Sequence, residues 1–292
     1  MISTKIVRVD PLILKPDYFK EAADILRNGG LVIIPTETVY GIAANMLNKK
    51  AIERLYEIKQ RPRDKHFSLH IDTKEKLEDF ARDIPIIAYK LIGKFWPGPL
   101  TLILKSKNKD SIGIRMPNDE IALRLISTAN VPVVCPSANI SERPAPISFE
   151  QAINDLNGLV DFAIDAGITR LGVESSVVDL TSQAPQVLRE GALKKAEIEE
   201  VSNKKVVLFI CTGNSCRSVM AKGLLEKKLK ERNRQDIEVL SRGIMMLGGL
   251  GPTEETRELL KKEGIDVSEH YSQRVDRYTI RKSDIILVME KL

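Results

Sequence analysis

Short apolar segments with the length of buried strands alternate with segments of helical spacing, and this alternation restricts the fold more than any other feature. Three such strands are predicted at Leu31–Pro35, Thr101–Lys105 and Val131–Cys135. Helices are predicted at Asp17–Asn28 and Asn48–Lys59, and a third is expected to begin at Lys74 and reach Phe80. Strands that alternate with helices indicate a layered α/β fold.

A polar and charged stretch, Lys194–Lys205, interrupts this pattern and indicates a domain boundary. Val206–Ile210 then opens a new unit of strand, tight loop and helix, and Asp284–Met289 is predicted as a later buried strand. A chain of 292 residues has the length of about two domains. We therefore expect a first domain over residues 1–200 and a second over residues 204–292.

Composition excludes several classes of protein. With 43% hydrophobic and 29% charged residues, the chain has the composition of an ordinary globular protein. It contains neither an apolar run near the ~20 residues of a membrane span nor the apolar core of a secretory signal. Three cysteines are too few for a disulfide framework. We expect a cytoplasmic protein without membrane contact, whose net charge of +5 suits anionic ligands such as nucleotides or tRNA.

Polar segments rich in cations and hydroxyls interrupt the apolar strands of the first domain. Pro35–Gly41 directly follows a strand, which is where open α/β sheets place their ligands. Lys59–His70 brings several cations together, and Glu174–Asp179 adds hydroxyls. A single lysine or arginine is most often a solvated surface charge, but several cations beside hydroxyls predict a site for a nucleoside triphosphate and a small acid.

The ordered set of these segments resembles the YrdC family of threonylcarbamoyl-AMP synthases. The motifs are P-T-E-T-V-Y-G, K-x-R-P with a following lysine, W-P-G-P-L-T, R-x-P, S-A-N-x-S, S-S-V-V-D and L-R-E-G. They occur in the order of the family and cover roughly residues 5 to 195. The resemblance implies a twisted mixed sheet with a deep, concave and positively charged cavity.

The resemblance also implies the reaction, which forms threonylcarbamoyl-AMP from L-threonine, bicarbonate and ATP and releases pyrophosphate. A carbamate oxygen of the carboxylated threonine would attack the α-phosphate, so that catalysis rests on positioning and charge stabilisation without a protein nucleophile. Mg²⁺ would accompany ATP, although the sequence shows no metal site made by the protein alone. A tRNA-modifying threonylcarbamoyl transferase complex would take the product, and contact with tRNA is possible.

Carried over by motif, the resemblance assigns five residues to L-threonine: Thr36, His70, Arg115, Cys135 (through its backbone) and Ser175. It assigns eight residues to ATP: Lys59, Arg61, Lys65, Ser111, Ser137, Asn139, Ala145 and Arg189. One departure bears on the nucleotide. Glu142 stands where the family has glycine after S-A-N-x-S, and we expect its negative charge to weaken nucleotide affinity without abolishing activity.

The second domain places C-x₅-R-S between a buried strand and a helix predicted over Ser218–Arg232. In such a loop the backbone N–H groups and the helix N-terminus hold phosphate, and Arg217 clamps it. The same field makes Cys211 a thiolate nucleophile, to which Ser218 can donate a hydrogen bond. C-T-G-N-S-C-R-S, with S-R-G, G-I-D-x-S-x-H and D-I-I-L-V-M further on, resembles the low-molecular-weight protein phosphatases and implies a parallel three-layer fold.

The phosphatase resemblance carries three further expectations. Cys216 would be the redox partner of Cys211, and Ser215 favours phosphoarginine over phosphotyrosine. The family's general acid is an aspartate in D-P-[YF] beyond the strand that matches D-I-I-L-V-M, and the 292 residues contain no such motif. We therefore expect a C-terminally incomplete domain in a fragment of a longer fusion, with little phosphatase activity and with Ile285–Val288 near an exposed apolar edge.

Two other functions stay open at this point. The chain could be a module that binds double-stranded RNA or tRNA without synthase activity, or protein-arginine or protein-tyrosine phosphatase activity could be its main function. The retained cations and amides of the first domain favour a synthase over an RNA-binding module. The missing general acid disfavours a phosphatase as the main activity.

Overall fold

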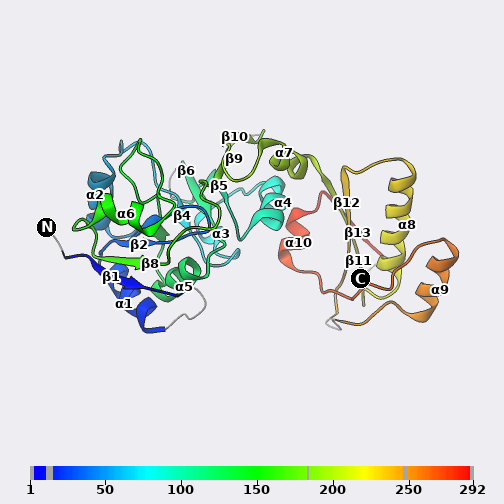
Figure 1. The fold of residues 1–292 in the computed structure, drawn as a ribbon. Helices are drawn as coiled ribbons and strands as arrows, with labels where there is room; N and C mark the ends of the chain where they lie inside the picture. The colour runs from blue at the N-terminus through cyan, green and yellow to red at the C-terminus, as the bar shows by residue number, and fades with distance from the viewer. Residues whose placement is uncertain (1–2, 11–15, 109, 183, 246–248, 290–292) are drawn as a thin grey trace. The chain divides into compact units, whose positions relative to one another are not determined.

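The computed structural model describes residues 3–10, 16–108, 110–182, 184–245 and 249–289 (Figure 1). The chain forms two compact units. The first contains Met1–Ile84 and Lys94–Glu197, and the second contains Pro85–Gly93 and Ile198–Leu292. Each unit has its own sheet, and each is described by itself.

Up to residue 203 the structure alternates strands and helices, as the sequence predicts. In chain order the elements are β1 (Lys5–Arg8), α1 (Pro16–Arg27), β2 (Val32–Ile34), β3 (Gly41–Asn45), α2 (Lys49–Lys59), β4 (Leu69–His70), α3 (Leu77–Phe80), α4 (Ile86–Phe95), β5 (Leu100–Lys105), β6 (Ser111–Arg115), α5 (Glu120–Ala129), β7 (Val133–Val134), α6 (Phe149–Leu156), β8 (Phe162–Asp165), β9 (Ser176–Asp179), β10 (Gln186–Arg189) and α7 (Lys195–Asn203).

The first unit is built on one mixed sheet. Within the described residues it has ten strands in the order β1-β8-β2-β3-β7-β4-β6-β5-β9-β10. The pairs β1–β8, β2–β8, β4–β6 and β5–β9 are parallel, and the remaining pairs are antiparallel. The prediction of a mixed α/β sheet is confirmed.

Successive apolar residues of β2 point to opposite faces of this sheet, which gives it a core on each side. Val32 and Ile34 belong to a cluster that includes α1 and α5, whereas Leu31 and Ile33 belong to a cluster that includes α2 and α6. Figure 1 shows these helix pairs over opposite faces of the sheet. A strand buried on both faces explains why Leu31–Pro35 is continuously apolar.

The start of the third helix was predicted too early. Lys74 and Glu75 accept from Leu77 N and Glu78 N in turns of three residues, and α3 begins at Leu77. Its N-terminal flanking residue, Lys76, makes no side-chain capping hydrogen bond. By contrast, α2 begins where expected because Asn48 Oδ1 accepts from Ala51 N at 3.1 Å.

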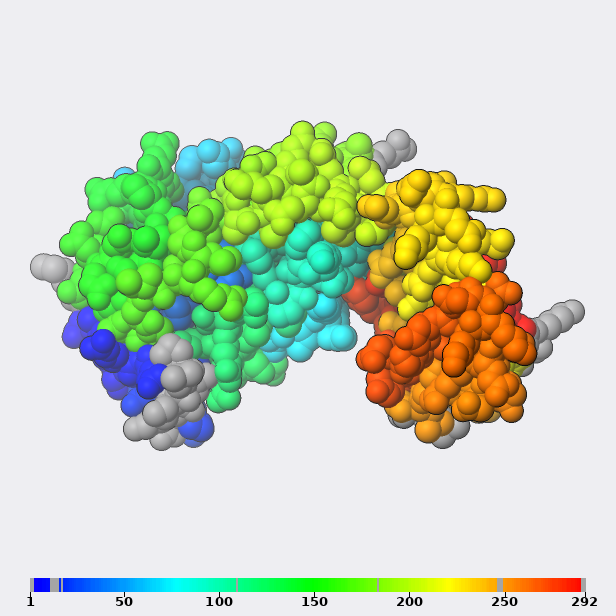
Figure 2. Space-filling model, turned by 45° about the vertical axis from the view of Figure 1, so that its right-hand side comes forward, coloured from blue at the N-terminus to red at the C-terminus, as the bar shows by residue number. Residues whose placement is uncertain are grey.

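The second unit has a small parallel sheet, as the sequence predicts. Its elements after α7 are β11 (Lys205–Cys211), α8 (Arg217–Glu231), β12 (Ile237–Gly243), α9 (Glu254–Lys262), α10 (Arg277–Lys282) and β13 (Ile285–Val288). Within the described residues the strand order is β12-β11-β13, and both pairs are parallel. Figure 1 shows α8 and α10 on opposite sides of this sheet, and Figure 2 shows α9 and the segment after it in orange on the surface of the unit.

The strand at Asp284–Met289 forms as β13, but it is not buried as a whole. All four of its residues are exposed, from 41% for Ile286 to 64% for Val288. Because β13 pairs only with β11 among the described strands, one of its backbone edges has no partner there. The expectation of an exposed apolar edge at Ile285–Val288 is therefore confirmed, and the expectation of a buried strand is wrong.

Candidate active site

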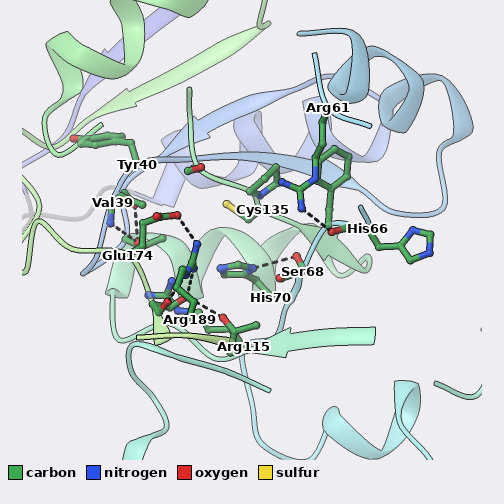
Figure 3. Close-up of a pocket in the computed structure, with 17 residues that line it drawn as sticks. Val39, Tyr40, Arg61, His66, Ser68, His70, Arg115, Cys135, Glu174 and Arg189 are labelled. Carbon is green, nitrogen blue, oxygen red and sulfur yellow. Dashed lines mark hydrogen bonds and ion pairs between the residues drawn. The ribbon is translucent and has the colours of Figure 1, made fainter. Parts of the chain in front are cut away.

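A pocket with about 650 Å³ of empty space, part of it open to solvent, lies entirely within the first unit (Figure 3). It is lined by Thr36, Val39, Tyr40, Gly41, Arg61, His66, Phe67, Ser68, His70, Thr101, Arg115, Cys135, Pro136, Ser137, Glu174, Ser175 and Arg189. All five residues predicted to contact L-threonine are among them, as are three of the eight predicted to contact ATP. Figure 3 shows His70 near the middle, with Arg61 on one side and Arg115 and Arg189 on the other.

The sheet register brings the first group together. His70 ends β4 and pairs with Arg115 at the end of β6, and it also pairs with Val133 on β7. Cys135 follows β7 directly, and Ser175 directly precedes β9. Residues that are far apart in the sequence therefore meet where neighbouring strands begin or end.

Gly41 allows the loop after β2 to approach the loop after β7. A Cβ atom at Gly41 would lie 2.4 Å from Cys135 Sγ and 3.1 Å from the Pro136 carbonyl oxygen. Since real Cβ atoms do not approach so closely, a larger residue here would displace the Cys135 side chain and press on the backbone at Pro136. The glycine that ends P-T-E-T-V-Y-G thus lets two segments of the pocket wall approach each other closely.

The guanidinium groups of the pocket are held by surrounding acceptors. Arg115 Nε donates to Gly98 O at 3.3 Å, and its Nη2 donates to Thr38 Oγ1 at 2.9 Å and lies 2.8 Å from Glu37 Oε1. Arg61 Nε donates to Lys65 O at 2.8 Å, with the guanidinium 5.4 Å from the centre of the Phe67 ring. Fixed guanidinium groups of this kind suit carboxylate and phosphate ligands.

Two pKa shifts describe the field inside the pocket. Burial, and then the positive charge of Arg115, lower the pKa of His70 to about 3, so its imidazole is neutral near pH 7. Burial and then the nearby charge of Arg189 lower the pKa of Arg61, although Tyr56 acts against this. Cations that disfavour one another in an open pocket favour an anionic ligand between them.

The hydroxyl of Thr36 is committed to its own loop. Thr36 Oγ1 donates to Val39 O at 2.7 Å, so in its 2.9 Å contact with Thr38 Oγ1 the Thr38 hydroxyl is the donor. Thr38 Oγ1 in turn accepts from Arg115 Nη2. Thr36 therefore lines the pocket with a hydroxyl whose single proton is already in use.

Lys59 and Asn139, both predicted ATP contacts, lie beneath the wall of the pocket. Lys59 Nζ donates to Ser137 O, Asn139 O and Asn139 Oδ1 at 2.6, 2.8 and 3.2 Å. These contacts match the three N–H donors of the ammonium group. Burial, and then the charge of Arg61, lower the pKa of Lys59 to about 8. The structure thus places Lys59 where it supports the Ser137–Asn139 loop.

Three other predicted ATP residues, Lys65, Ser111 and Ala145, do not line the pocket in the part of the chain that the structure describes. Lys65 is exposed, and its carbonyl oxygen, rather than its ammonium group, contacts Arg61. Ser111 begins β6, at the opposite end of that strand from Arg115. The structure therefore does not bring these three together with the residues around His70.

Nine of the seventeen lining residues were not assigned to a ligand from the sequence, and two of them, Glu174 and Thr101, make side-chain hydrogen bonds to assigned residues. Glu174, which directly precedes S-S-V-V-D, lies 2.7 Å from Arg189 Nη1 through its Oε1. Thr101, the last residue of W-P-G-P-L-T, lies 2.9 Å from Ser175 Oγ through its Oγ1. Arg189 also donates to Ser175 O at 2.9 Å and to Ser175 Oγ at 3.3 Å. The motifs signalled both residues, but only the fold shows their contacts.

Metal-binding and membrane-spanning features are absent from the part of the chain that the structure describes. Within the described ranges, no group of three or more histidine, cysteine, aspartate or glutamate side chains could hold a metal ion. Within the same ranges, no helix has the length and apolar character needed to cross a membrane.

The second unit carries the predicted phosphate loop. Cys211 ends β11, and its Sγ lies 3.0 Å from Ser218 Oγ. Asn214 N donates to the same sulfur at 3.3 Å. Burial raises the pKa of Cys211, but the hydrogen bonds from Ser218, Asn214 and Gly213 outweigh it and hold the pKa below its usual value. Arg217 begins α8, and its Nη2 donates to Thr212 Oγ1 at 3.3 Å.

The motif G-I-D-x-S-x-H contributes to the same loop. His270 Nε2 lies 2.7 Å from Asn214 O, and Gln273 N donates to Asn214 Oδ1 at 2.9 Å. Asn214 has a positive φ of 52° and is fully buried, so these contacts hold a left-handed residue in place inside the loop. The loop is therefore built by two distant segments of the unit.

Comparison with family models assigns each unit. The Sua5/YciO/YrdC model, described as telomere recombination, matches residues 24–191, and the model of low molecular weight phosphotyrosine protein phosphatases matches residues 206–292. Both resemblances expected from the motifs are thereby confirmed.

Individual relatives agree with the first assignment. The chain is 42% identical over 212 residues to the threonylcarbamoyl-AMP synthase of Pyrococcus abyssi, and 39% identical over 202 residues to that of Bacillus subtilis. These matches cover 70% and 66% of the chain but only 62% and 58% of the two relatives. The crystal structure of P. abyssi Sua5 complexed with L-threonine superposes with a TM-score of 0.62 at 29% identity, covering 99% of this chain and 100% of that one. Over residues 24–191, more than half of its length, the chain belongs to the Sua5/YciO/YrdC family.

Proposed function

We propose that the first unit forms threonylcarbamoyl-AMP and pyrophosphate from L-threonine, bicarbonate and ATP. The observation that carries this proposal is one pocket that combines Arg61, Arg115 and Arg189 with the neutral imidazole of His70. The names of the relatives, and the complex of P. abyssi Sua5 with L-threonine, support the same substrates. The reaction needs sites for a carboxylate and a triphosphate, and separate guanidinium groups can serve the two.

In this proposal Arg115 and Ser175 together bind the carboxylate of L-threonine. Neutral His70 packs beside it without adding a competing charge. The buried backbone at Cys135 closes this end of the pocket. The arrangement holds the amine where it takes up carbon dioxide or bicarbonate, so that the carbamate oxygen faces the α-phosphate of ATP.

Arg61 and Arg189 are proposed to receive the phosphates and to stabilise the charge that develops at the α-phosphate. Ser137, on the loop supported by Lys59, lines the nucleotide side. Lys65, Ser111, Asn139 and Ala145 stay proposed nucleotide residues. Mg²⁺ is proposed to enter with ATP and to be held mainly by its phosphates, because Glu174 is the only carboxylate among the described residues of the pocket.

We further propose that the product passes to a tRNA-modifying threonylcarbamoyl transferase complex in the cytoplasm, with tRNA contact. The mildly basic charge of the chain is compatible with that partner. The synthase is proposed to comprise residues 1–200 and the phosphatase-like domain residues 204–292.

The test is pyrophosphate release from ATP by the full chain, with and without L-threonine and bicarbonate. We expect release that needs both, and we expect Arg61→Ala to reduce it at least tenfold. Arg63→Ala is the matched control, because Arg63 is exposed, pairs with Glu53 and does not line the pocket. Binding of double-stranded RNA without ATP, with no pyrophosphate release from folded protein, would contradict the proposal and favour an RNA-binding module.

A second activity is supported by the geometry around Cys211. Its sulfur accepts from a loop amide and contacts the Ser218 hydroxyl, and its pKa is lowered, as a phosphoryl-accepting thiolate requires. We propose that this loop binds phosphomonoester or phosphoarginine side chains. Because little turnover is expected without the general acid, the test is binding: calorimetry with inorganic phosphate compares wild type with Arg217→Ala, whose guanidinium borders the loop. Equal affinities, or no binding by folded wild type, would contradict the proposal.

A further inference from the structure

Thr101 is a residue of the sheet whose side chain, with its hydroxyl, borders the pocket. It lies in β5, is 4% exposed and lines the cavity. Since β5 runs parallel to β9 with Thr101 opposite Val177, its side chain reaches the residues that enter β9. Its Oγ1 lies 2.9 Å from Ser175 Oγ. That is the only hydrogen bond of the Thr101 hydroxyl to a described residue.

The protons of this pair can be counted. A guanidinium group only donates, so Ser175 Oγ is the acceptor in its 3.3 Å contact with Arg189 Nη2. Thr101 and Ser175 each carry one O–H, and one of these two protons lies between their oxygens. When the Ser175 proton occupies the contact, Ser175 offers a ligand only a lone pair. When the Thr101 proton does, the Ser175 O–H is free to point into the pocket.

The charge of the ligand decides between the two arrangements. A carboxylate only accepts hydrogen bonds, so it selects the arrangement in which Thr101 donates to Ser175 and Ser175 donates to the ligand. In that arrangement Ser175 Oγ accepts from both Thr101 and Arg189, which polarises its O–H and strengthens its donation. A buried hydroxyl with a single partner is suited to act as the fixed donor at the end of such a chain.

We propose that Thr101 is a positioning residue that makes Ser175 a hydrogen-bond donor to the carboxylate of the amino-acid substrate. The inference rests on the proposed synthase function and deepens it, because it names the substrate group to which Ser175 donates a hydrogen bond. Thr101 acts through Ser175. Loss of the Thr101 hydroxyl therefore weakens binding of the amino acid and leaves binding of the nucleotide almost unaffected.

The experiment compares Thr101→Val and Thr101→Ser in the full chain. Valine keeps the shape and removes the hydroxyl, whereas serine keeps the hydroxyl and removes the methyl group. Calorimetry measures the Kd for L-threonine, and pyrophosphate release measures the KM for L-threonine and for ATP separately. We expect Thr101→Val to raise the Kd and KM for L-threonine about fivefold to tenfold, as loss of one hydrogen bond implies. The KM for ATP is expected to change less than twofold, and Thr101→Ser to bind L-threonine like wild type.

A double-mutant cycle locates the effect at Ser175. On a Ser175→Ala background, Thr101→Val is expected to cause no further loss of L-threonine affinity, because the hydroxyl it orients is gone. If valine at this position prevents folding, Thr101→Ala and Thr101→Ser give the same comparison of a side chain without and with the hydroxyl.

The outcomes separate this inference from the function on which it rests. L-threonine affinity unchanged in Thr101→Val, or lost together with ATP affinity, would overturn the positioning role while leaving the synthase intact. A loss that persists undiminished on the Ser175→Ala background would overturn it as well, because Thr101 would then contact the substrate itself. No L-threonine binding by folded wild type would overturn both proposals.

Discussion

Glu37 Oε1 lies 2.8 Å from Arg115 Nη2, with both side chains almost completely withdrawn from solvent. Neither carboxylate oxygen of Glu37 meets hydrogen-bond geometry with a described partner, so the attraction is mainly between charges. The pair compensates a buried guanidinium that lines the pocket, and Glu37 itself belongs to P-T-E-T-V-Y-G.

Removing Glu37 leaves the charge of Arg115 buried without its counter-ion. We expect Glu37→Ala to lower the free energy of unfolding by about 3 kcal/mol, because breaking a buried pair costs far more than breaking an exposed one. Denaturant unfolding measures this. The control is Glu120→Ala, which breaks an exposed pair with Arg124 and is expected to cost less than about 0.5 kcal/mol. Equal effects of the two variants would contradict the account of Glu37.

Lys59 supports the Ser137–Asn139 loop through three hydrogen bonds. We expect Lys59→Met to weaken ATP binding at least tenfold and L-threonine binding much less, because that loop borders the proposed nucleotide side. Calorimetry with each ligand measures the difference. Lys49→Met, on the exposed start of the same helix, is the control. Unchanged ATP affinity in Lys59→Met would show that the loop keeps its position without the ammonium group.

His70 makes stability depend on pH. Its folded pKa is lowered from 6.5 to about 3, so between these values the unfolded chain binds more protons than the folded one. Stability from this residue is therefore complete above pH 6.5 and falls by about 1.4 kcal/mol per pH unit as pH decreases toward 3. We expect the pH dependence of the unfolding free energy between pH 4 and 6 to be shallower by about that slope in His70→Gln. Equal slopes in both proteins would mean that His70 is not neutral in the fold.

Glu142 adopts a φ of 73°, in the left-handed region that favours glycine. We expect Glu142→Gly to raise the unfolding free energy by about 1 kcal/mol. Glu142→Ala separates charge from backbone, because it removes the carboxylate but keeps the Cβ atom. Both variants are expected to bind ATP more tightly, and only glycine is expected to raise Tm. A higher Tm in both variants would mean that the charge of Glu142, rather than its backbone conformation, destabilises the fold.

The Cys211 thiol is expected to react with iodoacetamide with an apparent pKa below the usual ~8.5, because Ser218 and the loop amides stabilise the thiolate. Ser218→Ala is expected to raise that apparent pKa and to slow alkylation at pH 7. Cys135 is an internal control, since burial raises the pKa of its thiol to about 12. Peptide mass spectrometry after timed alkylation reports all three cysteines. Faster labelling of Cys135 than of Cys211 would contradict this description of the loop.

The sequence predicted those features that depend on local pattern. The strand at Leu31–Pro35 and the helix of Asn48–Lys59 follow from apolar spacing and from the capping side chain of Asn48. The extent of α3 was missed because an uncapped helix start leaves no clear signal in the sequence. The exposure of β13 depends on which strands flank it, and an apolar run such as Ile285–Val288 does not reveal its neighbours.

The site was predictable as a set of motifs but not as a set of contacts. His70 and Arg115 meet because strands β4 and β6 pair in a register that places them opposite each other. The two motifs do not predict this register by themselves; only the resemblance to the family implied that the two residues share a site. The motif of Lys59 did not predict that its ammonium group would donate hydrogen bonds to Ser137 and Asn139. Thr101 and Glu174 lie in recognised motifs, but their partners, Ser175 and Arg189, are 74 and 15 residues away. Such contacts need the folded chain.

The most direct test of the central claim is detection of the product itself. The full chain is incubated with ATP, L-threonine and ¹³C-bicarbonate, and mass spectrometry follows threonylcarbamoyl-AMP. The account predicts a product that carries the ¹³C label, requires L-threonine and falls at least tenfold in Arg61→Ala but not in Arg63→Ala. Absence of the labelled adenylate from reactions with folded protein, while ATP and L-threonine remain unconsumed, would contradict it.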